Sequence, residues 1–241
     1  MHATGGGVPA TRAEFAIGSL RRCALFAGVD EPTLARCIDT LGSRRYRRNE
    51  TIFHQGDPGE SLYILESGSV KIVLPSPGSA DDAIIATLTR GDFFGELALL
   101  DGAPHSATAV ATEPSEALLL GRTRFQDLVE ADPALRRALF AGLAAELRRL
   151  TGHVEELLFL DLPGRLASRI AHLARETQPG QATEVRLDWP YTQSDLASMV
   201  GGTRQTVNRI LADMTMQGLI RVERDTLVIP DLARLDRAAE R

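Results

Sequence analysis

Residues 191–220, YTQSDLASMVGGTRQTVNRILADMTMQGLI, contain two short helical patterns separated by a pair of glycines. Thr192 and Asp195 form a T-x-x-D capping signal for the first helix, and Thr203 stands at the capping position of the second. The glycines at 201–202 permit a tight turn between the two helices. In the second helix, apolar residues at i, i+3, i+4 and i+7 form a stripe that must face a core, namely Val207, Ile210, Leu211 and Met214. The stretch therefore predicts a helix-turn-helix.

The outward face of the second predicted helix is polar. It belongs to the half of a recognition helix that meets base edges in the major groove. Arginine can donate two hydrogen bonds to guanine, glutamine pairs with adenine, and threonine hydroxyls reach phosphates. The predicted DNA-binding residues are Thr192, Thr203, Arg204, Gln205, Thr206, Asn208 and Arg209. The alternative is a helical domain that contacts only proteins, with the arginines as solvated charges.

Charge restricts how this chain can contact DNA. The net charge is -5, which argues against a protein that coats nucleic acid over its whole surface. Residues 161–241 hold 11 arginines and 11 acidic residues, so this segment is neutral overall. A DNA contact must therefore come from a local patch. After Gly218, the segment LIRVERDTLVIP predicts a two-stranded wing that turns at 223–226.

Length and composition fit two ordinary domains, since 241 residues with 44% hydrophobic content can bury a sizeable core. Cys23 and Cys37 lack the paired spacing of zinc or iron–sulfur ligands, so no metal, iron–sulfur or haem site is predicted. No apolar run approaches the roughly 18 residues of a membrane span, and the start of the chain lacks the apolar core of a signal peptide. We expect a cytoplasmic protein with no membrane partner.

From residue 44 to about 121, short apolar runs alternate with glycine-containing turns, as in SLYILESGSVKIVL. This punctuation is typical of short antiparallel strands, and it predicts a jelly roll or barrel. Upstream, Asp30 can cap a helix that has Pro32 in its first turn and ends before Gly42.

After Pro133 the pattern becomes helical for about 27 residues. Its apolar residues are spaced 4, 3, 4 and 3 apart, which is a heptad seam: Leu143, Leu147, Leu150, Val154 and Leu157. A repeat of 3.5 residues keeps one stripe facing a partner helix, so the pattern favours a parallel homodimer. The alternative is a long helix packed on its own domain.

These patterns predict an α+β chain in four parts. Residues 1–20 are expected to be a flexible tail, and 21–132 an effector domain built on a β jelly roll. Residues 133–160 are expected to form the dimerisation helix, and 161–241 a winged helix-turn-helix domain.

In this order, the parts resemble the CRP/FNR family of bacterial transcription regulators, and the likeness covers nearly the whole chain. The segments that carry it are QGDPGESLYILESGSVKI, GDFFGELALLDGAPHSATAVA, FLDLPGRLASRIAHLA and VGGTRQTVNRIL. The resemblance implies a cyclic-nucleotide-binding-like jelly roll and a homodimer that reads palindromic DNA, with half-sites roughly 34 Å apart. It also implies that RNA polymerase contacts the surface near residues 178–188. Gln205 stands where the best-known members carry Glu.

The resemblance also implies an effector site, whose residues are Gly95, Glu96, Leu97, Ala98, His105, Ser106 and Thr151. In relatives that bind cyclic AMP, the glutamate at the Glu96 position binds the ribose and the serine at the Ser106 position binds the phosphate. His105 occupies the place of their phosphate-binding arginine. Histidine has an unperturbed pKa of about 6.5 and lacks the planar fork of arginine. Leu150 and Thr151 align with a Thr-Ser pair that contacts adenine.

Three outcomes stay open for this site. It binds a cyclic nucleotide weakly through His105, Ser106 and backbone groups, it binds another small acid or an apolar effector, or it is vestigial. The sequence thus commits to no cofactor, although cyclic AMP or another cyclic nucleotide is a candidate.

Catalysis is not expected. Asp101, His105 and Ser106 include the residue types of a hydrolase triad, but neighbouring side chains at the start of a strand point to opposite faces. The chain has no nucleophile elbow, Walker loop or H-E-x-x-H motif. The function classes that remain are a sequence-specific DNA-binding regulator and a ligand-binding module that acts through protein partners.

Overall fold

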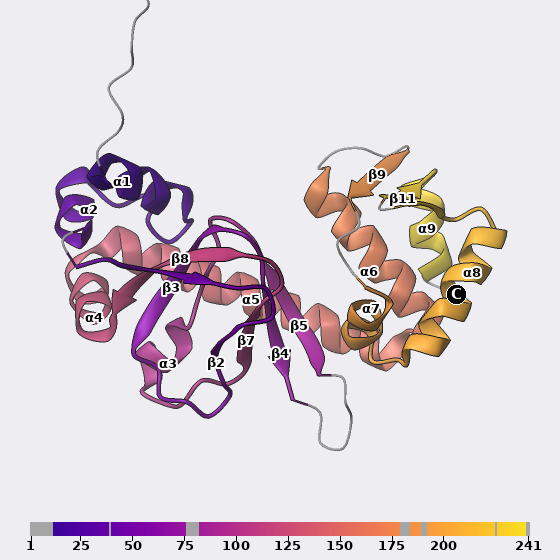
Figure 1. Cartoon of the computed structure of the whole chain (residues 1–241), viewed down its shortest axis with the longest axis horizontal. Coiled ribbons are helices and arrows are strands. Elements are labelled where there is room, and N and C mark those ends of the chain that lie inside the picture. Colours follow the sequence, from indigo (N-terminus) through magenta and orange to yellow (C-terminus); the bar gives the residue numbers. More distant parts are fainter. Residues whose placement is uncertain are drawn as a thin grey trace, which may run out of the picture. The chain divides into compact units, whose positions relative to one another are not determined.

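The computed structural model describes residues 12–38, 40–75, 82–178, 184–188, 192–224 and 226–239 (Figure 1). The chain divides into two compact units, residues 1–75 with 85–146 and residues 76–84 with 147–241. No helix among the described residues is both long enough and apolar enough to cross a membrane.

The first unit begins with two helices, α1 (Arg12–Arg22) and α2 (Glu31–Ile38). The expectation of a tail that extends to residue 20 is wrong for residues 12–20, because Leu20 is completely buried and anchors α1 in the core of this unit. Residues 1–11 lie outside the described part of the chain. The Asp30 carboxylate accepts a hydrogen bond from the backbone N–H of Thr33 (2.8 Å), as the capping prediction requires.

Two four-stranded sheets form the body of the first unit (Figure 1). One has the order β1-β8-β3-β6, with the bounds Gly42–Tyr46, Ser115–Gly121, Ser61–Ser67 and Phe93–Phe94. The other has the order β2-β7-β4-β5, with the bounds Thr51–Phe53, Thr108–Ala111, Val70–Leu74 and Ala83–Leu88. Strands distant in sequence pair antiparallel, as β1 does with β8 and β2 with β7. This arrangement confirms the predicted jelly-roll class.

A glycine makes one tight connection of the jelly roll possible. Gly68, between β3 and β4, has φ +84°, in the left-handed region that side chains rarely adopt. A Cβ atom there would lie 2.2 Å from Ser115 Oγ and 2.6 Å from the Pro114 carbonyl oxygen. The turn therefore packs directly on the entrance to β8, where only glycine fits.

Three more helices are present: α3 (Glu96–Asp101) between β6 and β7, and α4 (Arg122–Ala131) and α5 (Pro133–Phe159) after β8. α5 is the 27-residue helix that the heptad pattern predicted. Its first part is anchored by Leu135 and Leu139, which are buried in the core of the first unit. Its last part, from Leu147, belongs to the second unit.

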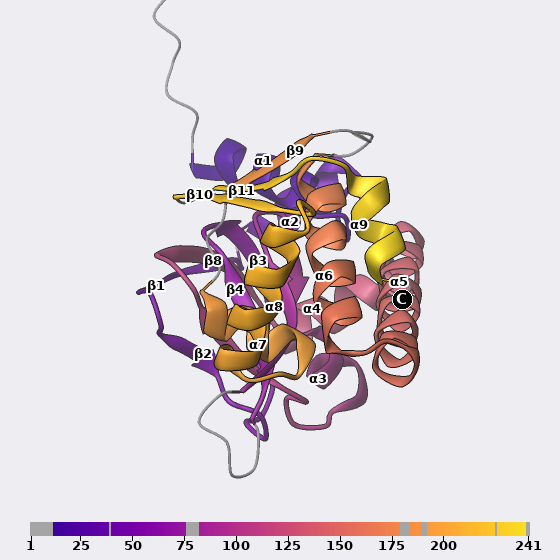
Figure 2. The same ribbon diagram turned by 90° about the vertical axis from the view of Figure 1, so that its right-hand side faces the viewer.

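The second unit continues with α6 (Leu162–Thr177), β9 (Val185–Asp188), α7 (Gln193–Val200), α8 (Arg204–Met216), β10 (Arg221–Glu223), β11 (Thr226–Ile229) and α9 (Leu232–Ala239). Figure 2 shows α9 beside α6, and the two helices pack closely. A Cβ atom on Gly164 would lie 2.7 Å from the Ala239 carbonyl oxygen, so this approach depends on glycine. Apolar residues of α6, α7, α8 and α9 share the core: Leu166, Ile170, Leu196, Val207 and Leu235.

The predicted wing is present, and it is larger than expected. β10 and β11 pair antiparallel across the turn that contains Arg224, whose φ is +50°. β9 adds a third strand on the other side of β11, so the sheet has the order β10-β11-β9. Within the segment 178–188, for which polymerase contact was expected, residues 179–183 lie outside the described part.

Candidate DNA-binding and effector sites

The turn between α7 and α8 has the geometry that its sequence predicts. The Thr192 hydroxyl accepts a hydrogen bond from the backbone N–H of Asp195 (3.1 Å), and the Asp195 carboxylate accepts one from the backbone N–H of Thr192 (2.9 Å). This reciprocal capping box fixes the start of α7. Gly201 ends the helix with φ +71°, and a Cβ atom on Gly202 would lie 2.9 Å from Leu162 Cδ2. The backbone conformation at 201 and the close contact at 202 therefore both favour glycine.

α8 begins at the predicted cap. The Thr203 hydroxyl accepts a hydrogen bond from the backbone N–H of Thr206 (3.2 Å), and the two hydroxyl oxygens lie 2.9 Å apart. Val207, Ile210 and Met214 are buried, whereas Leu211, which we expected in the same core stripe, is only half-buried. The stripe holds α8 in one rotational setting on the domain.

Three of the four predicted base-reading side chains are exposed together on α8: Arg204, Gln205 and Arg209. Asn208 differs from the expectation of a fully outward residue. It is half-buried, and its Oδ1 atom is buried without a hydrogen-bond partner among the described residues.

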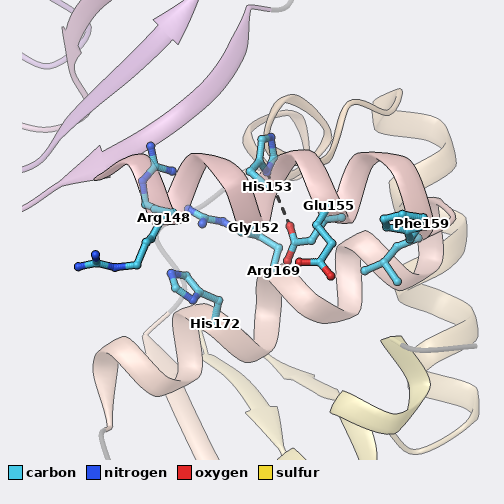
Figure 3. Close-up of a pocket in the computed structure, with 10 residues that line it drawn as sticks. Arg148, Gly152, His153, Glu155, Phe159, Arg169 and His172 are labelled. Carbon is cyan, nitrogen blue, oxygen red and sulfur yellow. Dashed lines mark ion pairs between the residues drawn. The ribbon is translucent and has the colours of Figure 1, made fainter. Parts of the chain in front are cut away.

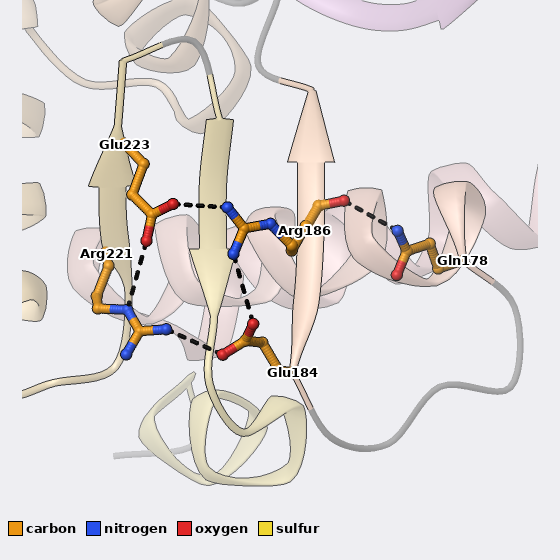
Figure 4. A network of polar contacts seen from close by, with 5 residues as sticks. All are labelled: Gln178, Glu184, Arg186, Arg221 and Glu223. Atoms are coloured by element: carbon orange, nitrogen blue, oxygen red, sulfur yellow. Dashed lines mark hydrogen bonds and ion pairs between the residues drawn. The ribbon is translucent and has the colours of Figure 1, made fainter.

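The wing carries a network of ion pairs that sequence analysis missed (Figure 4). Arg186 on β9 pairs with Glu223 (2.6 Å) and Glu184 (3.5 Å). Arg221 on β10 pairs with Glu184 (2.9 Å) and Glu223 (4.0 Å). Each arginine thus pairs with one carboxylate across β11 and with one on its own side of that strand. The sequence carries the patterns E-x-R at 184–186 and R-x-E at 221–223, which could have indicated the network. Which arginine meets which glutamate across the sheet, however, depends on the strand register.

The ion pairs reduce the positive charge of the wing. Since Arg186 and Arg221 are engaged with glutamates, the wing strands contribute little net positive charge. Arg204 and Arg209 of α8 are exposed as well, and neither belongs to this network.

Four of the predicted effector residues, Gly95, Glu96, Leu97 and Ala98, lie at the start of α3. Gly95 has φ +86°, and a Cβ atom there would lie 3.0 Å from the Tyr63 ring. Ala98 is buried against Gly59, where a Cβ atom would lie 2.4 Å from that of Ala98. Leu97 is 46% exposed and points away from this packing. Burial raises the pKa of the Glu96 carboxyl, and the nearby charge of Glu146 raises it further.

His105 is held on an aromatic surface. Its ring lies parallel to Phe53, with centroids 3.6 Å apart and an interplanar angle of 8°. Its backbone N–H donates to the Asp57 carbonyl oxygen (2.8 Å), and its own carbonyl accepts from Gly56 N–H (2.9 Å). The residue is 6% exposed, and burial lowers its pKa below the usual value. The arginine position of the resembled family thus holds an imidazole whose neutral form is favoured.

Ser106 is exposed while His105 is buried, so the two side chains diverge. The following strand begins at Thr108 and not at Ser106, because the His105 backbone pairs with the 56–57 turn before the strand starts. Asp101 lies at the end of α3, and its carboxylate accepts from the backbone N–H of Ala103 (2.9 Å). These positions do not assemble a catalytic triad.

Thr151 belongs to the part of α5 in the second unit. Its side chain is exposed, and its hydroxyl donates to the Leu147 carbonyl oxygen of the same helix (2.9 Å). No group of three or more metal-ligating side chains occurs among residues that the structure describes.

The seam of α5 is mostly exposed. Leu147, Leu150, Val154 and Leu157 are 67%, 38%, 54% and 46% exposed. Leu143 differs, since it packs against the core of the first unit rather than continuing the seam. Three apolar side chains of α5 outside the seam are more exposed than most of it: Phe140, Leu158 and Phe159.

A β jelly roll, a long helix with an exposed apolar seam and a winged helix-turn-helix are the architecture of a transcription regulator with a cyclic nucleotide-binding-like domain. Residues 43–132 match the model of the cyclic nucleotide-binding domain, and residues 164–238 match that of the Crp-like helix-turn-helix domain. The chain belongs to the CRP/FNR family of transcription regulators.

Individual relatives agree with this assignment. The "CRP-like cAMP-activated global transcriptional regulator" of Mycobacterium tuberculosis (strain ATCC 25618 / H37Rv) is 34% identical over 222 residues, which are 91% of this chain and 98% of that protein. The "Cyclic AMP receptor protein" of Thermus thermophilus is 31% identical over 215 residues, covering 89% of this chain and 96% of that protein. The structure of FixK2 from Bradyrhizobium japonicum has a TM-score of 0.71 at 25% identity, covering 82% of this chain and 96% of that chain.

Proposed function

We propose that this transcription regulator acts as a homodimer that reads a palindromic DNA site with the α8 helix of each protomer. The observation that carries the proposal is the start of α8, where Arg204, Gln205 and Arg209 are exposed while Val207 and Ile210 anchor the opposite side. A helix held in this way presents its first turns to the edges of the bases.

Roles follow from the chemistry of each side chain. Arg204 and Arg209 donate in pairs to guanine, and Gln205 pairs with adenine, each good pair discriminating by about 1–3 kcal/mol. Thr192, Thr203 and Thr206 bind phosphates through hydroxyl or backbone groups at the helix starts. Asn208 contributes less to base contacts than these residues, because its side chain is half-buried.

The homodimer forms through α5. Leu147, Leu150, Val154 and Leu157 follow the alternating spacing of 3 and 4 residues of a heptad repeat, and they are too exposed to stabilise a single chain. A second copy of the same helix would bury both stripes and place two α8 helices on one duplex, with half-sites roughly 34 Å apart.

The β jelly roll serves as the effector domain, with Gly95, Glu96, Leu97, Ala98, His105 and Ser106 as its candidate residues. Thr151, which the resemblance adds to this set, belongs to the second unit. Several relatives are named for cyclic AMP, so a cyclic nucleotide is the first effector to test. In this chain the phosphate would meet Ser106 and a neutral His105 rather than an arginine, which makes its binding weak. An effector of lower charge suits the Phe53–His105 stack better.

The remaining assignments follow from the family. We place the protein in the bacterial cytoplasm, with RNA polymerase as a partner and no catalytic role of its own. The relatives are described as transcriptional regulators.

The test begins with selection of a DNA site from a random library by the purified full-length protein. Arg204→Ala and Arg209→Ala should each lower the affinity for the selected site by about 5- to 150-fold, as expected for loss of 1–3 kcal/mol. Arg237→Ala, at an exposed arginine of α9, is the matched control. Unchanged affinity in both α8 variants would leave only the interpretation that this domain contacts proteins.

A further inference from the structure

A cavity of about 440 Å³ lies within the second unit, between the last turns of α5 and the helix α6 (Figure 3). It is separate from the exposed face of α8 and from the residues around His105. Its size falls in the range of sites that hold small organic molecules, roughly 300–1,000 Å³. None of the predicted effector-binding or DNA-binding residues lines it.

One end of the cavity is basic. Arg148 lines it from α5, and Arg169 and His172 line it from α6 (Figure 3). Arg149 of α5 lines it too. Within the part of the chain that the structure describes, Arg148 and Arg169 make no ion pair, and the Nε atom of Arg169 is buried without a hydrogen-bond partner. Buried guanidinium nitrogens are usually hydrogen-bonded, so this one indicates a missing acceptor. Phosphate oxygens match the planar set of donors of an arginine side chain.

The middle of the cavity is acidic and well organised. The Glu156 carboxylate accepts a hydrogen bond from Ser168 Oγ (2.5 Å) and lies 3.7 Å from His153 Nδ1. This contact ties α5 to α6 and leaves Glu155 exposed at the cavity wall. The carboxylates repel a phosphate, so an anion can enter only at the arginine end.

Gly152 keeps the space between the helices open. It lies in the interior of a long helix, where glycine costs about 1 kcal/mol relative to alanine. A Cβ atom on Gly152 would contact nothing within 4 Å, so packing within the described chain does not require glycine here. Figure 3 shows Gly152 on the wall of the cavity, beside the Arg169 side chain. A bound molecule that fills this space would explain the glycine.

The cavity also stays accessible in the proposed dimer. In an α-helix each residue turns by about 100°, so Gly152 lies about 200° around the axis from both Leu150 and Val154. The seam and the cavity therefore occupy opposite sides of α5. A partner helix on the seam would leave the arginine end uncovered.

We propose that this cavity binds a nucleotide that carries at least two phosphate groups. The phosphates bind Arg148, Arg149 and Arg169, and the base lies against Phe159, which is 78% exposed at the other end of the cavity. Eleven residues of helix separate Arg148 from Phe159, which is about 16 Å and matches an extended nucleotide of this kind. Glu155 accepts a hydrogen bond from an amino or hydroxyl group between the two ends.

Such a ligand would contact α5 and α6 at once. Because α6 packs on α7 and α9, a bridge across the cavity would restrict the angle at which the DNA-binding helices leave α5. The site thus offers a second route of control, one that does not depend on the jelly roll.

The test is calorimetry on the full-length protein with ATP, inorganic pyrophosphate and adenosine, without divalent cations. ATP and pyrophosphate should bind, and adenosine should bind at least tenfold more weakly than ATP. Arg148→Gln and Arg169→Gln should each weaken ATP binding at least tenfold, while Arg237→Gln, in the same unit, should leave it unchanged. Gly152→Leu should abolish binding without loss of helix content, because it fills the cavity and improves helix propensity.

Several results would overturn the proposal. These are the absence of ATP binding by the wild type, or affinities unchanged in both arginine variants and in Gly152→Leu. A change in ATP affinity in His105→Arg but not in Arg169→Gln would place the ligand in the jelly roll instead. If the arginine variants weaken DNA binding while no probe binds, these arginines contact DNA phosphates. DNA binding is measured separately, so failure here leaves the proposed function untouched.

Discussion

His105 lies flat against Phe53, with ring centroids 3.6 Å apart, at the position where the resembled cyclic-nucleotide-binding proteins carry an arginine. Phe53 in turn contacts Tyr63 and Phe94, with centroids 5.5 and 5.9 Å away. The imidazole is therefore part of an aromatic cluster between the two sheets. Its burial lowers its pKa, and a neutral ring supplies no charge to an anion.

The first prediction concerns this substitution. His105→Arg should raise the affinity for cyclic AMP at least tenfold, which corresponds to about 1.4 kcal/mol, because it restores a permanently charged bidentate donor. Calorimetry with cyclic AMP, cyclic GMP and cyclic di-GMP on both proteins measures the change. His54→Arg adds the same charge at an exposed position and serves as the control. Equal affinities in wild type and His105→Arg would refute the role assigned to position 105.

The second prediction uses Glu96. Burial raises the pKa of Glu96 in the folded protein above the ordinary value of 4.5. Between the ordinary pKa and the raised one, the native state therefore binds more protons than the unfolded state. The wild-type free energy of unfolding should therefore fall as the pH rises through this window. Glu96→Gln removes the buried charge and should be more stable than wild type at pH 7.5.

Urea unfolding of wild type and Glu96→Gln at a series of pH values from 7.5 to 4.5 checks this dependence. The stability difference should shrink as the pH approaches 4.5, where the wild-type carboxyl is protonated in the native state. Glu60→Gln, at an exposed carboxylate, should show no such difference. A constant gap at every pH would mean that Gln acts by packing rather than by charge.

The third prediction concerns the seam. Val154→Glu should convert the dimer to a monomer at micromolar concentration, because it places two like charges across an apolar interface and removes two buried valines, each contributing about 1.5–3 kcal/mol. Val154 is 54% exposed in the single chain, so the fold of the protomer should be unaffected. Sedimentation velocity gives the mass, and Ala145→Glu, exposed on another side of α5, is the control. A dimer that survives Val154→Glu would place the interface elsewhere.

The fourth prediction compares two glycines. Gly56 and Gly68 have similar φ angles, +90° and +84°, but a Cβ atom contacts nothing within 4 Å at Gly56 and lies 2.2 Å from Ser115 Oγ at Gly68. Gly56→Ala should cost only the left-handed backbone term, about 1–2 kcal/mol. Gly68→Ala should cost substantially more, since the turn must also move away from β8. Chemical denaturation of both variants gives the two values, and equal losses would show that the β3–β4 turn relaxes freely.

Local chemistry in the sequence was sufficient for several parts of this protein. The capping pairs Thr192–Asp195 and Thr203–Thr206, the glycine turn between them and the apolar spacing of α8 all act within a few residues. The long helix α5 could also be predicted from the sequence, because a heptad repeat is a property of consecutive helical turns. The effector and DNA-binding residues assigned by resemblance remain predictions for the experiments above.

Contacts between distant segments were decided only by the tertiary structure. Register in the sheets brings Phe53 under His105 and Glu184 beside Arg221. Helix packing leaves Leu143 partly buried against the core of the first unit, and Asn208 half-buried on α8. The cavity beside Gly152 likewise exists only because α6 folds back along α5. Periodicity specifies which face of an element is apolar, but the residues that meet that face, and the pKa or ion pairing that results, depend on where the chain returns.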